Sequence, residues 1–137
     1  MEWTTELRYK RYEDWTEEEK KQIKENMANS PWHTHYHVEP KTGLLNDPNG
    51  FSYFNGKGIL FYQNFPFGAA HGLKSWVQLE SDDLVHFKET GLKVLPDTPL
   101  DSHGAYSGSA MQFDDKLFLF YTGNVRDEKW IRHPYQI

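Results

Sequence analysis

From residue 32 onward, the chain consists of short apolar and aromatic runs separated by turn-forming residues. The regular spacing of these runs constrains the fold more than any other feature. Two such runs, 51–54 and 59–63, flank Asn55-Gly56. Asn followed by Gly tolerates the positive φ angles of a two-residue turn, so this segment predicts an antiparallel hairpin. Further strands are expected at 76–80, at 85–88 with 92–95, at 109–113 and at 117–121.

The spacing of these predicted strands indicates an all-β fold. About four strands fall within roughly 50 residues, and a second group of strands with similar spacing begins at Tyr106. Four antiparallel strands in every ~40 to 50 residues is the spacing of a β-propeller blade. A β-sandwich or an open meander fits the same rhythm, so the spacing alone leaves three architectures open.

Residues 1–31 differ from the rest and predict a helical leader ahead of a β-domain at 32–137. Thr16 and Glu19 have the spacing of a capping box, in which each side chain bonds the backbone N–H of the other residue. The acidic run 17–19 favours a helix start, and Asn29-Ser30-Pro31 favours its end. We therefore expect one short helix at about residues 17–28.

Composition excludes several classes of protein. No run approaches the ~18 apolar residues that cross a bilayer, and the net charge of -5 comes without a basic stripe for nucleic acid. There is no cysteine, and residues 1–10 lack the pattern of a secretory signal, which favours a cytoplasmic protein. Five Trp, eight Tyr and nine Phe exceed the needs of a core this size, and aromatic rings beside polar groups are typical of sugar-binding sites, although burial in a β-sheet is the commoner role for most of them. The composition thus favours a small-molecule partner over a membrane or a nucleic acid.

One acidic residue, Asp47, stands at the end of an apolar run and is followed by Pro48-Asn49-Gly50. A proline restricts the residue before it to extended conformations, and Asn-Gly favours a sharp turn. The pattern predicts a carboxylate presented on a stiff corner. A plain turn that closes a strand accounts for the same four residues, and both interpretations stand at this point.

Taken with its neighbours, this segment resembles the opening signature of glycoside hydrolase family 32, the β-fructofuranosidases. The resemblance covers about residues 32–137, and further blocks of the family follow in the right order. The matching blocks are Tyr36-His37, Pro40, Gly43 and Asn46 to Gly50, then Phe61 to Gln63, Pro66, Trp76, Ser81 with Asp83 to Phe87, Pro96-Asp97, Ser107 to Ala110, and Tyr121 to Asn124.

The resemblance implies a retaining glycosidase that hydrolyses the terminal β-fructofuranoside bond of sucrose or sucrose-6-phosphate, with no cofactor and no metal. It makes Asp47 the catalytic nucleophile, which attacks the anomeric carbon of the fructosyl unit. The other site residues that it implies are Asn46 and Gln63 for the fructose hydroxyls, Ser107 for a further contact with the sugar, and Trp76 and Tyr106 for the pocket wall.

The resemblance also implies a five-bladed β-propeller, of which residues 32–137 would hold about the first two blades after the short helix. Two blocks of the family do not occur in the sequence: an Arg-Asp-Pro block, whose Asp stabilises the transition state, and a Glu-Cys block, whose Glu is the general acid/base. They are expected further along a longer protein. Since a general acid contributes on the order of 10² to 10⁴ in rate, residues 1–137 are expected to be inactive by themselves.

Two other functions fit parts of the sequence. His33, His35 and His37 alternate, and on a strand they would project from one face as potential Zn ligands. A solvated or hydrogen-bonded face is the commoner origin of such a pattern. The second alternative is a non-catalytic carbohydrate-binding module, which would keep the aromatic wall and Gln63 but would need no acid. The intact Asp47 argues against that module.

Overall fold

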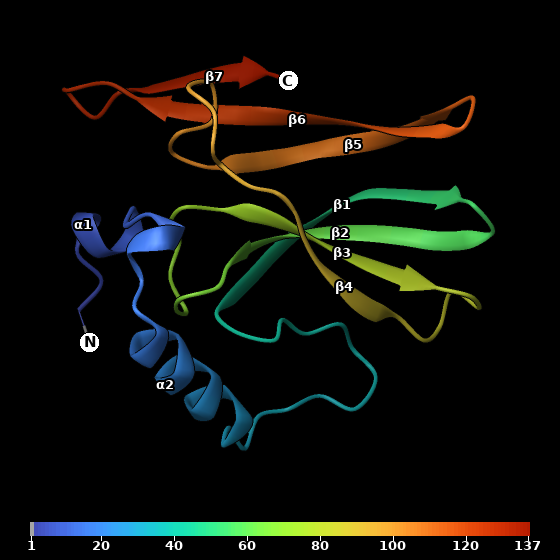
Figure 1. Cartoon of the computed structure of the whole chain (residues 1–137), viewed down its shortest axis with the longest axis horizontal. Helices are drawn as coiled ribbons and strands as arrows, with labels where there is room; N and C mark the ends of the chain where they lie inside the picture. Colours follow the sequence, from blue (N-terminus) through green and yellow to red (C-terminus); the bar gives the residue numbers. More distant parts are fainter. Residues whose placement is uncertain (1) are drawn as a thin grey trace.

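The computed structural model describes residues 2–137, in which seven strands form two antiparallel sheets (Figure 1). Within each sheet, every strand pairs with the next one along the chain, as in the meander of a propeller blade. The first sheet contains β1 (Leu44–Phe54), β2 (Lys57–Phe65), β3 (Ser75–Ser81) and β4 (Lys88–Val94), and the second contains β5 (Ala105–Phe113), β6 (Lys116–Arg126) and β7 (Arg132–Gln136).

The predicted hairpin between β1 and β2 is confirmed. Phe54 pairs with Lys57, and the turn residues Asn55 and Gly56 have φ angles of 51° and 77°. Positive φ at both central residues is the turn geometry that matches the right-handed twist of the flanking strands. The predicted strand at 76–80 is present as β3, and the last two predicted strands are present as the β5–β6 hairpin.

The structure differs from the prediction at β4 and β7. Asp83 Oδ1 accepts hydrogen bonds from the backbone N–H groups of Val85 (2.9 Å) and His86 (2.8 Å), so this segment forms a loop and β4 begins at Lys88. The sequence does not predict β7, because its residues are mostly polar and include Pro134. Proline is tolerated there because β7 is the edge strand of its sheet.

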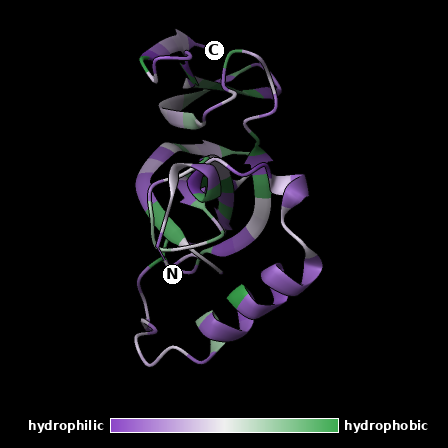
Figure 2. Cartoon of the chain, turned by 90° about the vertical axis from the view of Figure 1, so that its left-hand side faces the viewer, coloured by the Kyte–Doolittle hydropathy of each residue, from purple (hydrophilic) through white to green (hydrophobic). Residues whose placement is uncertain are grey.

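The leader contains the expected helix, α2 (Glu17–Ala28), with its capping box at Thr16 and Glu19. It also contains two short helical turns that the sequence does not predict, α1 (Thr5–Arg8) and a 3-10 helix at Tyr12–Asp14. No residue of α2 is buried, and its surface is mostly hydrophilic (Figure 2). None of the helices within residues 2–137 is long and apolar enough to cross a membrane.

The leader packs closely against the first sheet. Trp15 stacks on Phe67, with ring centroids 4.3 Å apart and planes 6° from parallel. The carbonyl oxygen of Arg8 accepts a hydrogen bond from the Leu73 N–H (2.7 Å), and the Leu73 carbonyl oxygen accepts one from the Tyr12 hydroxyl (3.0 Å). These contacts anchor the connection between β2 and β3.

A hydrophobic core joins the two sheets. Ile59, Phe61 and Trp76 of the first sheet pack with Ala105 of the second, and β1 and β5 lie side by side where the sheets meet (Figure 1). Trp76 is fully buried, and its Nε1 donates to the carbonyl oxygen of Tyr106 (3.0 Å). Because truncating a buried Trp costs about 3–5 kcal/mol, Trp76 is a major link between the sheets.

Much of the second sheet is exposed. All five residues of β7 are exposed, and the side chains of Met111 and Phe113 on β5 are 52% and 61% exposed. Phe118 and Phe120 on β6 are also exposed. Apolar side chains beside an open strand edge favour pairing with another chain.

We expect Gly43→Ala to destabilise the fold more than Gly56→Ala. Both glycines have positive φ, 74° and 77°, where an L-residue costs about 1–2 kcal/mol. A Cβ at Gly43 would lie 2.0 Å from the Phe65 carbonyl oxygen, whereas one at Gly56 meets nothing within 4 Å. Thermal unfolding of a longer protein that carries each substitution measures the difference. Equal melting temperatures would show that the close approach at Gly43 relaxes without cost.

Candidate active site

Asp47 occupies a bulge in β1. Asn46 pairs with Gln63 of β2 and Pro48 pairs with Tyr62, which leaves Asp47 without a partner. Its φ angle is 39°, in the left-handed region, so the extended backbone expected before Pro48 is wrong. A bulge reorients the side chain of the unpaired residue, and strained residues of this kind are concentrated at functional sites.

The sharp turn expected at Asn49-Gly50 is also wrong. β1 continues through these residues, with a second register shift between Asn49 and Ser52. The buried Asn49 side chain donates from Nδ2 to the Asp47 carbonyl oxygen (2.6 Å) and accepts at Oδ1 from the Gly108 N–H of β5 (3.1 Å). Asn49 therefore ties the bulge to the second sheet.

Hydroxyl and amide donors surround the Asp47 carboxylate. Ser107 Oγ donates to Asp47 Oδ2 (2.8 Å), and Gln63 Nε2 lies 3.3 Å from the same oxygen and 2.7 Å from Ser107 Oγ. Hydrogen bonding by Ser107 and then by Asn46 lowers the pKa of Asp47 against the opposing effect of burial, and the charge of Lys74 lowers it further. Asp47 is therefore ionised at neutral pH.

Lys74 brings a cationic group to the site that the sequence does not predict. The residue is only 4% exposed, and its Nζ bonds Asn46 Oδ1 and lies 2.9 Å from His71 Nδ1. Burial lowers the pKa of Lys74 to about 8, while the charge of Asp47 opposes this shift. The only signal in the sequence is a lysine directly ahead of the predicted buried strand at 76–80.

These side chains line a cavity of about 480 Å³, which is within the usual range for small-molecule sites. The Arg132 guanidinium lies over the ring of Tyr106, 5.4 Å from its centroid. The leader reaches the cavity through Tyr9. The full lining is Tyr9, Asn46, Asp47, Gln63, His71, Gly72, Lys74, Tyr106, Ser107, Thr122 and Arg132.

All but one of the predicted site residues line this cavity. The exception is Trp76, which is fully buried in the core between the sheets. The expectation that Trp76 shapes the pocket wall is therefore corrected. Trp76 does not line the cavity, but its indole N–H bonds the backbone carbonyl oxygen of Tyr106, which does. A Trp in an apolar strand fits a core position and a pocket wall equally well in the sequence, and the register of β3 decides between them.

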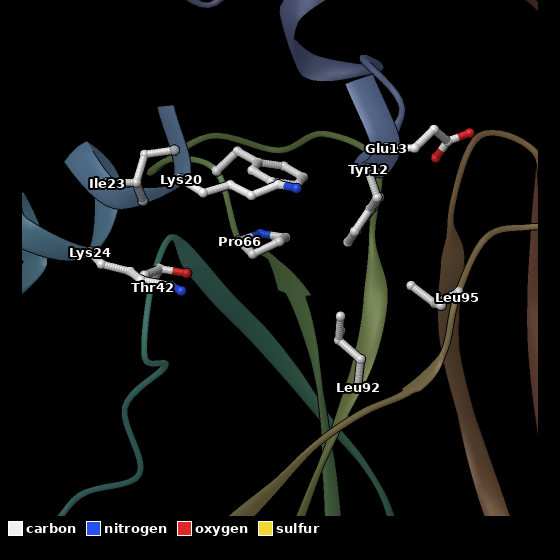
Figure 3. A pocket seen from close by; sticks show the side chains of 10 residues that line it. Tyr12, Glu13, Lys20, Ile23, Lys24, Thr42, Pro66, Leu92 and Leu95 are labelled. Carbon is white, nitrogen blue, oxygen red and sulfur yellow. The ribbon is translucent and has the colours of Figure 1, made fainter. Parts of the chain in front are cut away.

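A second cavity, of about 510 Å³, lies between α2 and the first sheet and has a different character. Ile23 of α2, Leu92 of β4 and Leu95 just after β4 give it apolar walls (Figure 3). Its one carboxylate, Glu13, is directed away from Ile23 and Pro66 (Figure 3). Reactive groups converge at Asp47 and not here, so the Asp47 cavity is the candidate active site.

The alternating histidines do not share a strand face. Residues 31–43 lie outside the strands, and the ring of His33 is engaged locally, by Glu39 at Nδ1 (2.7 Å) and by the Met27 carbonyl oxygen at Nε2 (2.9 Å). Across residues 2–137, no three His, Asp or Glu side chains are grouped so that they could hold a metal ion. His33 instead connects the end of α2 to the segment that follows.

Comparison with known proteins identifies the family of this chain. Residues 37–137 match the glycosyl hydrolases family 32 N-terminal domain. The chain is 76% identical over 131 residues to the sucrose-6-phosphate hydrolase of Streptococcus mutans and 58% identical over 137 residues to that of Lactococcus lactis. These alignments cover 96% and 100% of this chain but only 27% and 29% of the relatives, so the chain spans less than a third of their length.

Solved structures of similar proteins have the same fold. The sucrose-6-phosphate hydrolase from Lactobacillus gasseri matches 98% of this chain with a TM-score of 0.94 at 54% identity, over 28% of its own length. A mutant β-fructofuranosidase from Bombyx mori, solved in complex with sucrose, matches 89% of this chain with a TM-score of 0.69 at 30% identity, over 27% of its own length. The predicted all-β propeller fold is confirmed, and both sheets have the strand order of a propeller blade.

Proposed function

The chain belongs to glycosyl hydrolase family 32, and we propose that the longer protein containing it, called the full-length protein below, hydrolyses the terminal β-fructofuranoside bond of sucrose or sucrose-6-phosphate. The observation that carries this proposal is the Asp47 carboxylate, held on a bulge among hydroxyl and amide donors in a cavity of suitable size. The names of the curated relatives agree with it.

In the proposed reaction, Asp47 is the nucleophile of a retaining double displacement. Ser107 and Gln63 both bond its Oδ2, so Oδ1 is the oxygen assigned to attack on the anomeric carbon. The bond to the leaving oxygen breaks as an ester to Asp47 forms, and water then hydrolyses this ester. A second carboxyl group, about 5–5.5 Å from the first, gives its proton to the leaving oxygen. We assign that group to the part of the protein beyond these residues.

The neighbouring side chains are assigned to binding of the fructosyl unit. Asn46 and Gln63 present amide groups, and Ser107 presents a hydroxyl, which suit the hydroxyls of a sugar. Tyr106 supplies an aromatic wall, which Arg132 covers from one side. Two carboxyl groups suffice for this chemistry, so the proposal includes no cofactor and no metal.

We also propose further blades in the full-length protein and a cytoplasmic location. Further blades would close a five-bladed propeller and would cover the open edge at β7. The cytoplasmic location is proposed because a chain without cysteine forms no disulfide and so does not need an oxidising compartment.

Kinetics of the full-length protein with two sugars test the proposed reaction. We expect fructose release from both, with kcat/KM about 10-fold or more higher for sucrose-6-phosphate, because the guanidinium of Arg132 at the cavity can bond a phosphate. Maltose, a glucoside of similar size, serves as the control and should not be cleaved. Absence of fructose release from both sugars would exclude the proposed function.

Ser107→Ala is expected to move the acid limb of the pH profile upward. The Ser107 hydrogen bond is the largest cause of the lowered Asp47 pKa, and a lowered pKa keeps the carboxylate ionised to lower pH. Its removal raises that pKa, so kcat/KM declines at a higher pH, and the value at the optimum falls by about 10-fold. The pH profile of the full-length protein measures both changes, with Ser109→Ala on the same strand as the matched control. An acid limb at the wild-type pH would contradict the role given to Ser107.

A further inference from the structure

Lys74 is a buried cation beside the candidate nucleophile, and it takes part in none of the ion pairs between Lys and Asp or Glu within residues 2–137. Its amine instead bonds the amide oxygen of Asn46 and the imidazole nitrogen of His71. Burial of an ammonium group without a carboxylate in direct contact is costly. Its place in the cavity therefore calls for a reason other than packing.

An ammonium group can only donate hydrogen bonds, and this determines how the side chains next to it are oriented. Asn46 turns Oδ1 toward Lys74, so its Nδ2 faces Gln63 Oε1 at 3.1 Å. Gln63 then turns Nε2 toward Asp47 Oδ2 at 3.3 Å and Ser107 Oγ at 2.7 Å. The opposite orientation would place the amide oxygen of Gln63 against the Asp47 carboxylate, where two acceptors repel each other.

We propose that Lys74 is a positioning residue that sets the direction of this hydrogen-bond relay, so that Gln63 and Ser107 bond Asp47 Oδ2 and leave Oδ1 for attack. The proposal rests on the proposed function and adds to it a residue outside the family signature. Lys74 acts through Asn46 and Gln63, and it need not touch the reacting atoms. Its positive charge also stabilises the ionised form of Asp47.

Several ionisable groups share the cavity with Lys74, so its contribution is isolated by substitution at Lys74 itself. His71 Nδ1 lies 2.9 Å from the amine, the charge of Asp47 acts on it, and Tyr9, Tyr106 and Arg132 line the same cavity. A change to Arg keeps a cation that only donates. A change to Met removes the donor and the charge at similar length.

The test uses the full-length protein with Lys74→Met, Lys74→Arg and the control Lys93→Met, which removes an exposed lysine on β4. In Lys74→Met we expect kcat to fall about 10-fold or more with a smaller change in KM, since a donor to the nucleophile is misdirected. The acid limb of kcat/KM should move to higher pH, because an opposite charge near Asp47 is lost. Lys74→Arg should recover most of the lost kcat and most of the shift of the acid limb. Lys93→Met should match the wild type.

Wild-type kcat and a wild-type acid limb in Lys74→Met would overturn the proposal, as would a loss that a folded Lys74→Arg protein does not recover. If Lys74→Met does not fold, Lys74→Gln takes its place with the same expectations, since its amide can accept as well as donate. If the wild type itself releases no fructose, the proposed function fails separately. NMR titration of Asp47 in the wild type and in Lys74→Met then tests the inference. A higher Asp47 pKa in Lys74→Met supports it, and an unchanged Asp47 pKa overturns it.

Discussion

Asp47→Asn in the full-length protein is expected to lower fructoside turnover by about 10³-fold or more, as expected when the nucleophile of a catalytic unit is lost. The amide has nearly the shape of the carboxylate, but it carries no charge and does not form the ester. The hydroxyl of Ser107 can rotate to bond either group, so the fold should be retained. Initial rates of fructose release, together with melting temperatures, measure both expectations.

Asp115→Asn is the matched control for this substitution, because Asp115 is an exposed acid in the turn between β5 and β6. It should leave the rate unchanged. A pure Asp47→Asn protein that works at near the wild-type rate would remove the nucleophile assignment. Such a result would favour a role for Asp47 in the structure of the bulge alone.

The 137-residue chain by itself is expected to show no measurable hydrolysis of either sugar. In the proposed mechanism the general acid lies outside residues 1–137, and loss of such an acid lowers the rate by about 10² to 10⁴. Two blades also do not close a propeller, so one edge of the site stays open to water. Assays of the purified chain at high protein concentration, beside the full-length protein at matched concentration, provide the measurement.

The same chain is expected to self-associate, because the second sheet exposes β7 and apolar side chains such as Met111, Phe113 and Phe120. Light scattering across a concentration series measures this association. Phe113→Lys should reduce it, since the substitution adds charge at a side chain that is 61% exposed. A monodisperse chain that melts cooperatively as a monomer would contradict the expectation.

Local signals in the sequence predict the parts of the fold that depend on neighbouring residues. The capping box at Thr16 and Glu19 marks the start of α2, and Asn55-Gly56 marks the first hairpin, because caps and tight turns are determined within a few residues. The edge strand β7 carries no such signal. Its pairing with β6 depends on the whole sheet and not on its own polar residues.

In the candidate site, too, the sequence identifies some features, and others depend on long-range packing. Asn46 and Asp47 belong to one short motif, and Gln63 and Ser107 belong to later blocks of the family, so the resemblance identifies all four. The bulge at Asp47 is different, since it is defined by which residues of β2 lie opposite. Lys74 reaches the site through a loop held by the leader, a long-range packing effect that no local pattern contains.

The most direct test of Asp47 as the nucleophile is to identify the residue that forms the covalent ester. The full-length protein would be incubated with a slowly hydrolysed fluorinated fructoside, quenched in acid, digested and analysed by mass spectrometry. We predict one fructosyl unit attached to Asp47, and none in the Asp47→Asn protein. Attachment to another carboxylate, or first-formed fructose of inverted anomeric configuration, would contradict the retaining mechanism proposed for this site.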